Sequence, residues 1–244
     1  MFKNFIAFTV VIFIAIYTSS LFAEATGGIN CKKTVLDSFV ASYEIRTPKK
    51  TTLMNYYRIG DSVAYEYTNQ KMTEVWKKSV NGQAQLVRAF DAYNRSIEYD
   101  PIDVKMEHQS SSWDMHKNLA TPELFHLDNA LVSSKDGCAY QHYKKRISGK
   151  SIIMDFEANN QLLLSLEVKK DNEILYSYKL KNVKSIDKKQ NHLVSVLSYD
   201  STDFADIGDN ESDPFLSRMI TLGFITHKEA NIIDDKGNAL DLEK

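Results

Sequence analysis

The chain has 244 residues, with 30 Lys and Arg against 32 Asp and Glu and a formal net charge of −2 at pH 7. This near balance excludes a chain-wide electrostatic field that would draw the protein to nucleic acid or to an anionic membrane. The length fits one large β domain, or one domain with an appendage.

The N-terminal segment, residues 1–23, predicts a secretory signal peptide. Lys3 precedes an apolar run of about a dozen residues, and small residues and alanines follow it. Cleavage after Ala23 or Ala25 fits this pattern. A membrane anchor is the alternative, but a spanning helix needs about 20 apolar residues, and the polar segment Thr18–Ser20 interrupts the run. The sequence therefore predicts an exported, periplasmic protein that is not an integral membrane protein.

Two cysteines, Cys31 and Cys138, follow the predicted leader. In an oxidising compartment such a pair usually forms one disulfide. There is no Cys-x-x-Cys motif, and no His lies at ligand spacing from either cysteine, so a structural disulfide is favoured over a redox or metal site. Closing a loop of about 100 residues would contribute about 4 to 5 kcal/mol in the chain-entropy model.

The first predicted element is a short amphipathic helix at residues 34–40. Val35, Leu36, Phe39 and Val40 share one face at helical spacing.

From Ala41 onward the apolar period changes to two, which indicates β-strands. An Asn81-Gly82 dipeptide between two β-rich runs is a strong hairpin signal. The predicted strands of this meander are 53–59, 62–69, 72–78, 84–90 and 95–99.

Between Pro101 and Cys138 the β pattern stops. Thr121, Pro122 and Glu123 form a helix start, and apolar residues follow at helical spacing. We expect this helix to lie across the sheet. Its apolar positions are Leu124, Phe125, Leu127, Leu131 and Val132.

A second β block follows the predicted helix. Every second residue from Leu162 to Val168 is apolar, which indicates one packed face and one wetter face. Two-residue Asn-Asn and Asp-Asn turns join neighbouring strands as hairpins. The predicted strands are 139–147, 151–156, 161–168, 173–183 and 192–197.

The C-terminal region differs in composition. Residues 200–213 are acidic, and Asp213-Pro214 opens a predicted helix at 215–222. Thr226 with Glu229 forms a capping box for a last short helix. We therefore divide the mature chain into an antiparallel β domain, 24–198, and an acidic and helical appendage, 199–244.

Together these patterns predict a mainly β, α+β fold. An antiparallel meander would form an incomplete barrel or a strongly curved sheet, with an N-terminal helix, a mid-chain helix against the sheet and C-terminal helices. Periodicity does not decide between a barrel and an open sheet, because strand order is not encoded in it.

No residue pattern indicates a catalytic or metal site. None of the six histidines has a metal spacing, although Glu107-His108 and Trp113-Asp114-x-His116 could bring ligands together. The acidic segment 200–213 does not match the calcium-loop spacing. No nucleophile elbow or phosphate-binding glycine loop occurs. We predict no catalytic residue, no metal and no cofactor.

The strands are rich in aromatic residues. Such a sheet could form a concave cavity for an acyl chain or another apolar ligand, although an ordinary β-sheet core would have the same composition. The predicted ligand-binding residues are Tyr65, Tyr67, Trp76, Leu164, Leu166 and Tyr176.

The layout resembles the superfamily of periplasmic lipoprotein carriers and their sensor relatives (LolA-like and RseB-like). Three segments carry this resemblance: Val35–Ile45, Arg46–Lys49, and Ser151–Phe156 followed by Leu162–Val168. It implies an incomplete antiparallel barrel, closed by helices, whose concave side holds acyl chains or docks a partner without a cofactor. The tail from Tyr199 to Lys244 has no counterpart in that pattern.

Three functional hypotheses follow. The first is a non-catalytic periplasmic binding protein for an apolar ligand, a lipid or a lipoprotein acyl chain. The second is an envelope protein-interaction or regulatory module that contacts its partner through Pro214–Leu222. The third is a hydrolase in which a His such as His116 or His142 meets a Ser and an acid in three dimensions. Nucleic acid is not an expected partner.

Overall fold

The computed structural model describes residues 38–108, 112–125, 131–135, 137–187, 191–210 and 212–225. The predicted signal peptide, Cys31 and the predicted last helix lie outside the described residues, so these predictions stay untested. No helix in the described ranges is long and apolar enough to cross a membrane.

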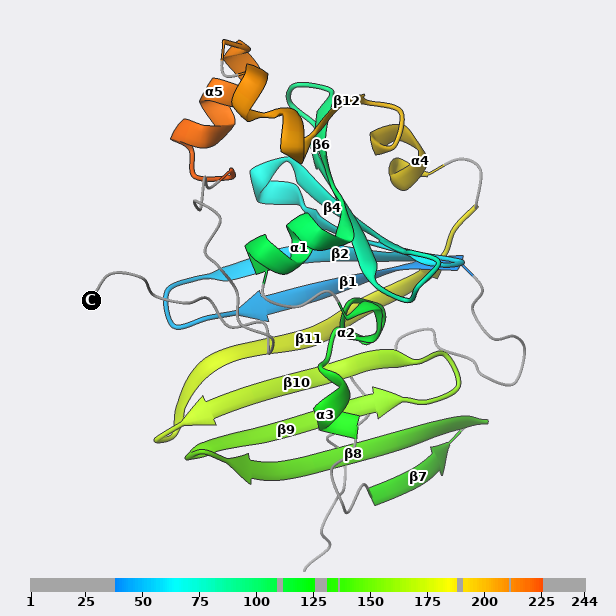
Figure 1. Ribbon diagram of the computed structural model, residues 1–244. Helices are drawn as coiled ribbons and strands as arrows, with labels where there is room; N and C mark the ends of the chain where they lie inside the picture. The colour runs from blue at the N-terminus through cyan, green and yellow to red at the C-terminus, as the bar shows by residue number, and fades with distance from the viewer. Residues whose placement is uncertain are drawn as a thin grey trace, which may run out of the picture.

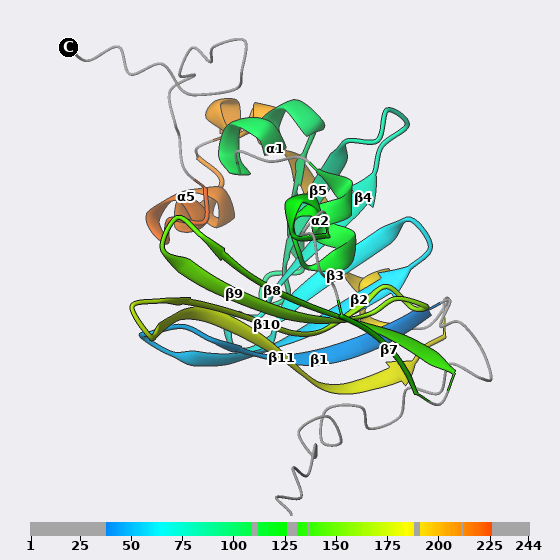
Figure 2. The same ribbon diagram turned by 90° about the horizontal axis from the view of Figure 1, so that it is seen from below.

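One curved, unclosed sheet of twelve strands forms the body of the protein (Figures 1 and 2). Its strand order is β12-β6-β5-β4-β3-β2-β1-β11-β10-β9-β8-β7. In chain order the strands are β1 (Ser38–Arg46), β2 (Thr51–Ile59), β3 (Ser62–Tyr67), β4 (Met72–Lys78), β5 (Ala84–Phe90), β6 (Arg95–Tyr99), β7 (Leu131–Lys135), β8 (Cys138–Ile147), β9 (Lys150–Glu157), β10 (Leu162–Lys170), β11 (Glu173–Ser185) and β12 (Asp200–Asp203).

Short helices cover the sheet. Helices α1 and α2 lie over the concave side of the sheet, which we call the inner face (Figure 2), and α3 packs against the apolar cluster of the same face. The opposite side is the outer face. The helices are α1 (Pro101–His108), α2 (Trp113–Asn118), α3 (Pro122–Phe125), α4 (His192–Val196) and α5 (Pro214–Thr221), with 3-10 turns η1 (Thr68–Gln70), η2 (Phe204–Asp206) and η3 (Gly208–Asn210).

The predicted mainly β, curved-sheet fold is confirmed, and the sheet is open. Strands β4, β5 and β6 have the bounds that the sequence predicted. At the predicted Asn81-Gly82 turn, Gly82 has a φ of 81°, a conformation that glycine adopts without steric cost. Antiparallel pairing between β1 and β11 joins the two predicted β blocks into one sheet.

Two apolar clusters pack against the two faces. The larger lies on the inner face and includes Phe39, Tyr56, Trp76 and Met154. The smaller lies on the outer face of the first β block, where Leu193 and Val196 of α4 cover the sheet. A central strand that is packed on both faces has a nearly continuous run of apolar residues in its sequence, rather than alternating apolar and polar residues.

The predicted helix at 34–40 is wrong in its described part, because Phe39 and Val40 lie in β1. This strand pairs with β2 on one side and with β11 on the other. Phe39 packs in the inner cluster, while Val40 packs against the outer one. Apolar residues on both faces therefore produced a spacing that also fits a helix.

The predicted strand at 192–197 is also wrong, because His192–Val196 forms α4. Asn191 caps this helix by accepting a hydrogen bond from the backbone N–H of Val194. Buried Leu193 and Val196 are three residues apart, which is helical spacing.

The mid-chain helix is confirmed at its start and is shorter than predicted. It begins at Pro122 as α3, but Leu131 and Val132 lie in the edge strand β7. Helices α1 and α2 precede it.

The C-terminal region packs onto the same sheet. Strand β12 pairs with β6 in parallel. The predicted helix at 215–222 is confirmed as α5, and Asp213 caps it by accepting from the Phe215 N–H at 2.7 Å. Phe215 and Leu216 are buried in the inner cluster. The residues that we assigned to an appendage thus contribute to the core.

We predict that Phe215→Ala lowers the free energy of unfolding by about 3 to 5 kcal/mol. The Phe215 ring lies 5.5 Å from the Phe90 ring and 4.8 Å below the Arg95 guanidinium. Urea unfolding followed by circular dichroism measures the change. Leu222→Ala, at a side chain that is 49 % exposed, is the control and should have little effect. An effect of Phe215→Ala as small as that of Leu222→Ala would show that the C-terminal region is independent of the core.

We also predict that Asp213 makes stability pH-dependent. Partial desolvation raises its pKa, but the Phe215 amide and Arg95 lower it by more, so the pKa lies below its ordinary value. A carboxylate with a lowered folded-state pKa stabilises the protein above its unfolded pKa of about 3.9 and loses this contribution as the pH falls.

The variant Asp213→Asn keeps an N-cap acceptor and loses the charge. We expect it to lower the free energy of unfolding at pH 7 by about 0.5 to 1 kcal/mol, with the difference from wild type vanishing near pH 2. Urea titrations across this pH range test it, with exposed Asp209→Asn as the control. A difference that persists unchanged at low pH would contradict the prediction.

Candidate ligand-binding site

A cavity of about 660 Å³ lies against the second β block. Edge strand β7 forms one wall, and strands β8 to β11 form the rest. The volume falls within the range of small-molecule sites, about 300 to 1,000 Å³. The lining residues are Ser133, Ser134, Lys135, Tyr140, Ile153, Asp155, Leu164, Ser165, Leu166, Glu167, Ser177, Tyr178 and Lys179.

Strand register places the cavity on the outer face. Asp155 is opposite Ser165, which is opposite Lys179, so these three side chains share one face. Their sequence neighbours Met154 and Leu166 point to the inner face, where both belong to the core. The cavity therefore lies on the side of the sheet opposite to α3.

The chemistry of the lining is amphipathic. Ile153 and the Tyr140 ring provide apolar surface, while serine hydroxyls, two acids and two lysines provide polar groups. The register shifts between Leu163 and Ser165, so Leu164 lies in a β-bulge at the cavity. Bulges redirect side chains and are frequent next to functional sites.

Asp155 holds a polar network at this cavity. Its Oδ2 accepts a hydrogen bond from Ser165 Oγ at 2.7 Å, and its Oδ1 lies 2.6 Å from His142 Nδ1. In an acyl-transfer triad the histidine lies between the serine and the acid, so that it can accept the serine proton. Here the acid lies between them. The arrangement orients Asp155 and does not activate Ser165.

The other candidate histidine, His116, has a structural role. Its ring stacks on Trp76 with centroids 3.5 Å apart and an angle of 14° between planes. The Tyr65 hydroxyl donates to the His116 carbonyl at 2.9 Å. Among the described residues, no group of three or more His, Cys, Asp or Glu side chains could hold a metal ion.

Two of the six predicted ligand-binding residues, Leu164 and Leu166, are part of the cavity lining, although both side chains are buried in the inner cluster. Tyr65 and Trp76 are buried on the inner face beneath α2. Tyr67 packs against the inner cluster, and the Tyr176 ring lies edge-on to Tyr178 at 6.4 Å with 40 % of the residue exposed. The structure therefore separates the six residues into two groups, and their contact with a ligand stays a prediction.

Buried tyrosines fasten α2 to the inner face. The Tyr56 hydroxyl donates to the Lys117 carbonyl at 2.6 Å. Burial raises the pKa of both Tyr56 and Tyr65 well above the ordinary value, so both hydroxyls remain protonated donors. The space that we expected an apolar ligand to occupy near Tyr65 and Trp76 is thus filled by a helix of the same chain.

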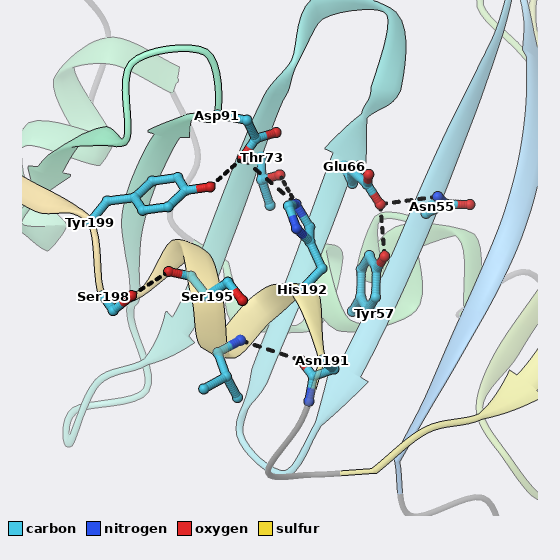
Figure 3. Close-up of polar contacts among 11 residues, drawn as sticks. Asn55, Tyr57, Glu66, Thr73, Asp91, Asn191, His192, Ser195, Ser198 and Tyr199 are labelled. Atoms are coloured by element: carbon cyan, nitrogen blue, oxygen red, sulfur yellow. Dashed lines mark hydrogen bonds and ion pairs between the residues drawn. The ribbon is translucent and has the colours of Figure 1, made fainter.

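A second polar group lies on the outer face beside α4 (Figure 3). His192 Nε2 lies 3.0 Å from Thr73 Oγ1 and 3.8 Å from Asp91 Oδ1. The Tyr199 hydroxyl donates to the same Asp91 oxygen at 3.2 Å. Thr73 is fully buried and cannot reach a substrate, so these contacts anchor α4 to the sheet.

The predicted disulfide stays a prediction. Cys138 is buried at the start of β8, and Cys31 lies outside the described residues.

We predict that Tyr56→Phe loosens α2. The variant leaves the Lys117 carbonyl without this donor, which should lower the free energy of unfolding by about 1 to 2 kcal/mol. Amide hydrogen exchange in residues 113–118 should accelerate at the same time. Exposed Tyr93→Phe is the control. Unchanged exchange in α2 would show that the hydroxyl does not hold the helix.

Comparisons with known proteins give structural similarities alone, because no family model and no curated protein matches the sequence. The chain is similar to PNGF-II with a TM-score of 0.41 and 10% identity, over 68% of this chain and 30% of that one. It is similar to MucB in complex with MucA(peri), with a TM-score of 0.34 and 10% identity, over 64% of this chain and 53% of that one. It is also similar to the MucA/MucB complex of Pseudomonas aeruginosa, with a TM-score of 0.33 and 11% identity, over 64% of this chain and 54% of that one. The chain thus spans less than two thirds of the length of each.

Proposed function

We propose that this protein is an exported, periplasmic and non-catalytic binding protein for an amphipathic ligand, a lipid or the acyl chain of a lipoprotein. The cavity between β7 and strands β8 to β11 is the observation that carries the proposal. Its mixed lining suits a ligand with one apolar part and one polar head, because apolar walls supply affinity and a few polar groups fix orientation.

Edge strand β7 extends the apolar surface beside the cavity. Leu131 and Val132 are 72 % and 70 % exposed. Exposed apolar surface next to a cavity can serve as part of an interaction surface. Leu131 is opposite His142 and shares the outer face with the cavity, whereas Val132 points to the other face. An acyl chain that follows β7 on the outer face would shield Leu131 from water.

The polar part of the lining suits the ligand's head group. Ser177 and Glu167 are opposite each other on the outer face, and Lys179 is the next outward residue of β11. Lys179 is a positive hydrogen-bond donor, and the serine hydroxyls both donate and accept. The Asp155 network gives no activated nucleophile, so binding without turnover is the activity that this geometry supports best.

An envelope protein-interaction module is the second candidate function. Strand β7 is one of the two edge strands of the sheet and all five of its residues are exposed, so it could accept an extended partner strand. The alternative contact through α5 is less favoured, because Phe215, Leu216 and Met219 of that helix pack into the core.

The variant Ser177→Trp tests the proposed ligand site. The indole would fill the cavity from β11 without removing a charge. We predict that wild type purified gently from its own envelope carries a stoichiometric lipid or acylated peptide, detected by native mass spectrometry and organic extraction. Ser177→Trp should carry at least about tenfold less, a cost of about 1.4 kcal/mol in binding.

The matched control is Ser185→Trp, at the exposed far end of β11, which should keep wild-type occupancy. Thermal unfolding shows whether each variant is folded. Equal ligand content in both variants would contradict the site. A wild-type protein without any bound lipid, but with a captured protein, would favour the interaction module.

A further inference from the structure

Three hairpins have their turns side by side at the same end of the strands of the curved sheet. They are the β1–β2, β8–β9 and β10–β11 hairpins, and Figure 1 shows their turns at the same end of the strands. The register agrees, because Lys170 is opposite both Lys150 in β9 and Glu173 in β11, and Arg46 is opposite Ser177. We call the segments 46–51, 144–151 and 169–174 the basic rim.

The basic rim concentrates positive charge. Its three segments contain nine Lys or Arg and two acidic residues, although the whole chain has 30 basic and 32 acidic residues. Lys169 pairs with Glu167 at 2.6 Å. The other eight make no ion pair within the described part of the chain. Their charges are therefore available to an external anionic partner. These eight are Arg46, Lys49, Lys50, Lys144, Lys145, Arg146, Lys150 and Lys170.

An apolar side chain projects from the same rim. Ile147 is 39 % exposed and directly precedes the Ser148-Gly149 turn. Both residues of this turn have positive φ, 49° and 77°, as do Asp171 and Asn172 in the β10–β11 turn. Such two-residue turns match the twist of the strands, so they present Ile147 and its basic neighbours on short, well-defined tips.

A hollow of about 640 Å³ lies between two of the turns. Residues 46–51 line it on one side and residues 172–174 on the other. The β1–β2 turn is closed by hydrogen bonds between Thr47 and Lys50, including Thr47 N–H to the Lys50 carbonyl at 2.9 Å. The hollow is thus lined by three cationic residues, Arg46, Lys49 and Lys50, and by one acidic residue, Glu173.

We propose that the basic rim docks the protein on an anionic phospholipid surface. Lysine and arginine close to such a surface each contribute about 1 kcal/mol of attraction. The hollow would accept a phosphate-bearing head group, and Ile147 would enter the interface. The three segments contain no aromatic residue, although proteins that bind single-stranded nucleic acid stack bases on aromatic rings. The charge therefore fits a lipid surface better than a nucleic acid.

Vesicle flotation with the exported protein tests this proposal. Vesicles of phosphatidylcholine alone are compared with vesicles that contain about 30 mol% phosphatidylglycerol. We expect binding to the anionic vesicles at about 0.15 M salt, weaker binding at about 0.5 M, and little binding to the neutral vesicles. The triple variant Lys50→Glu/Arg146→Glu/Lys170→Glu, with one change in each hairpin, should bind anionic vesicles at least about tenfold more weakly.

The matched control reverses three exposed charges elsewhere, Lys78→Glu/Lys105→Glu/Arg218→Glu, and should bind like wild type. Because both variants have the same net charge, equal loss in both would overturn the proposal, as would equal binding to neutral vesicles. Retention on DNA without vesicle binding would also overturn it. Ser177→Trp should still bind vesicles, so this result is separate from the proposed ligand site.

Discussion

Buried tyrosine hydroxyls on the inner face are the constraint on which the arrangement depends. A hydroxyl that loses water without gaining a partner costs about 1 to 3 kcal/mol. Tyr43 donates to the Leu163 carbonyl at 2.7 Å and so connects β1 to β10. Tyr56 and Tyr65 donate to carbonyls of α2. The sheet must therefore curve, and α2 must cover its concave side, for these donors to be satisfied.

This constraint changes where a ligand could bind. Because α2 and the Trp76–His116 stack fill the inner face near Tyr65, the cavity of the second β block lies on the outer face instead. The outer face of the first β block is covered by α4. The two halves of one sheet thus differ: one half has both faces covered, and the other keeps an accessible amphipathic cavity beside an exposed edge strand.

Much of the fold could be predicted from local sequence. Strands β4 to β6 were found with their bounds because alternation and turn residues agree there. Strand β1 was mistaken for a helix because it is packed on both faces, and α4 was mistaken for a strand because its Asn191 cap was not recognised. Long-range pairing with β2 and β11 decides the first case, and a local helix cap decides the second.

The candidate sites were harder to predict. Aromatic strand positions do not show whether a ligand or a helix of the same chain covers them, so Tyr65 and Trp76 were assigned to a ligand although α2 covers them. The balanced net charge concealed the basic rim, whose segments come together through strand pairing. Clusters such as Lys144–Arg146 beside a predicted turn were the available signal.

Tryptophan quenching tests the central claim that the ligand lies on the outer face. Both tryptophans, Trp76 and Trp113, are buried in the inner cluster. A fatty acid brominated along its chain is titrated into the protein, while native mass spectrometry records how much is bound. We predict that binding saturates with tryptophan fluorescence unchanged. Quenching that rises in parallel with the bound fraction would place the acyl chain on the inner face and contradict this account.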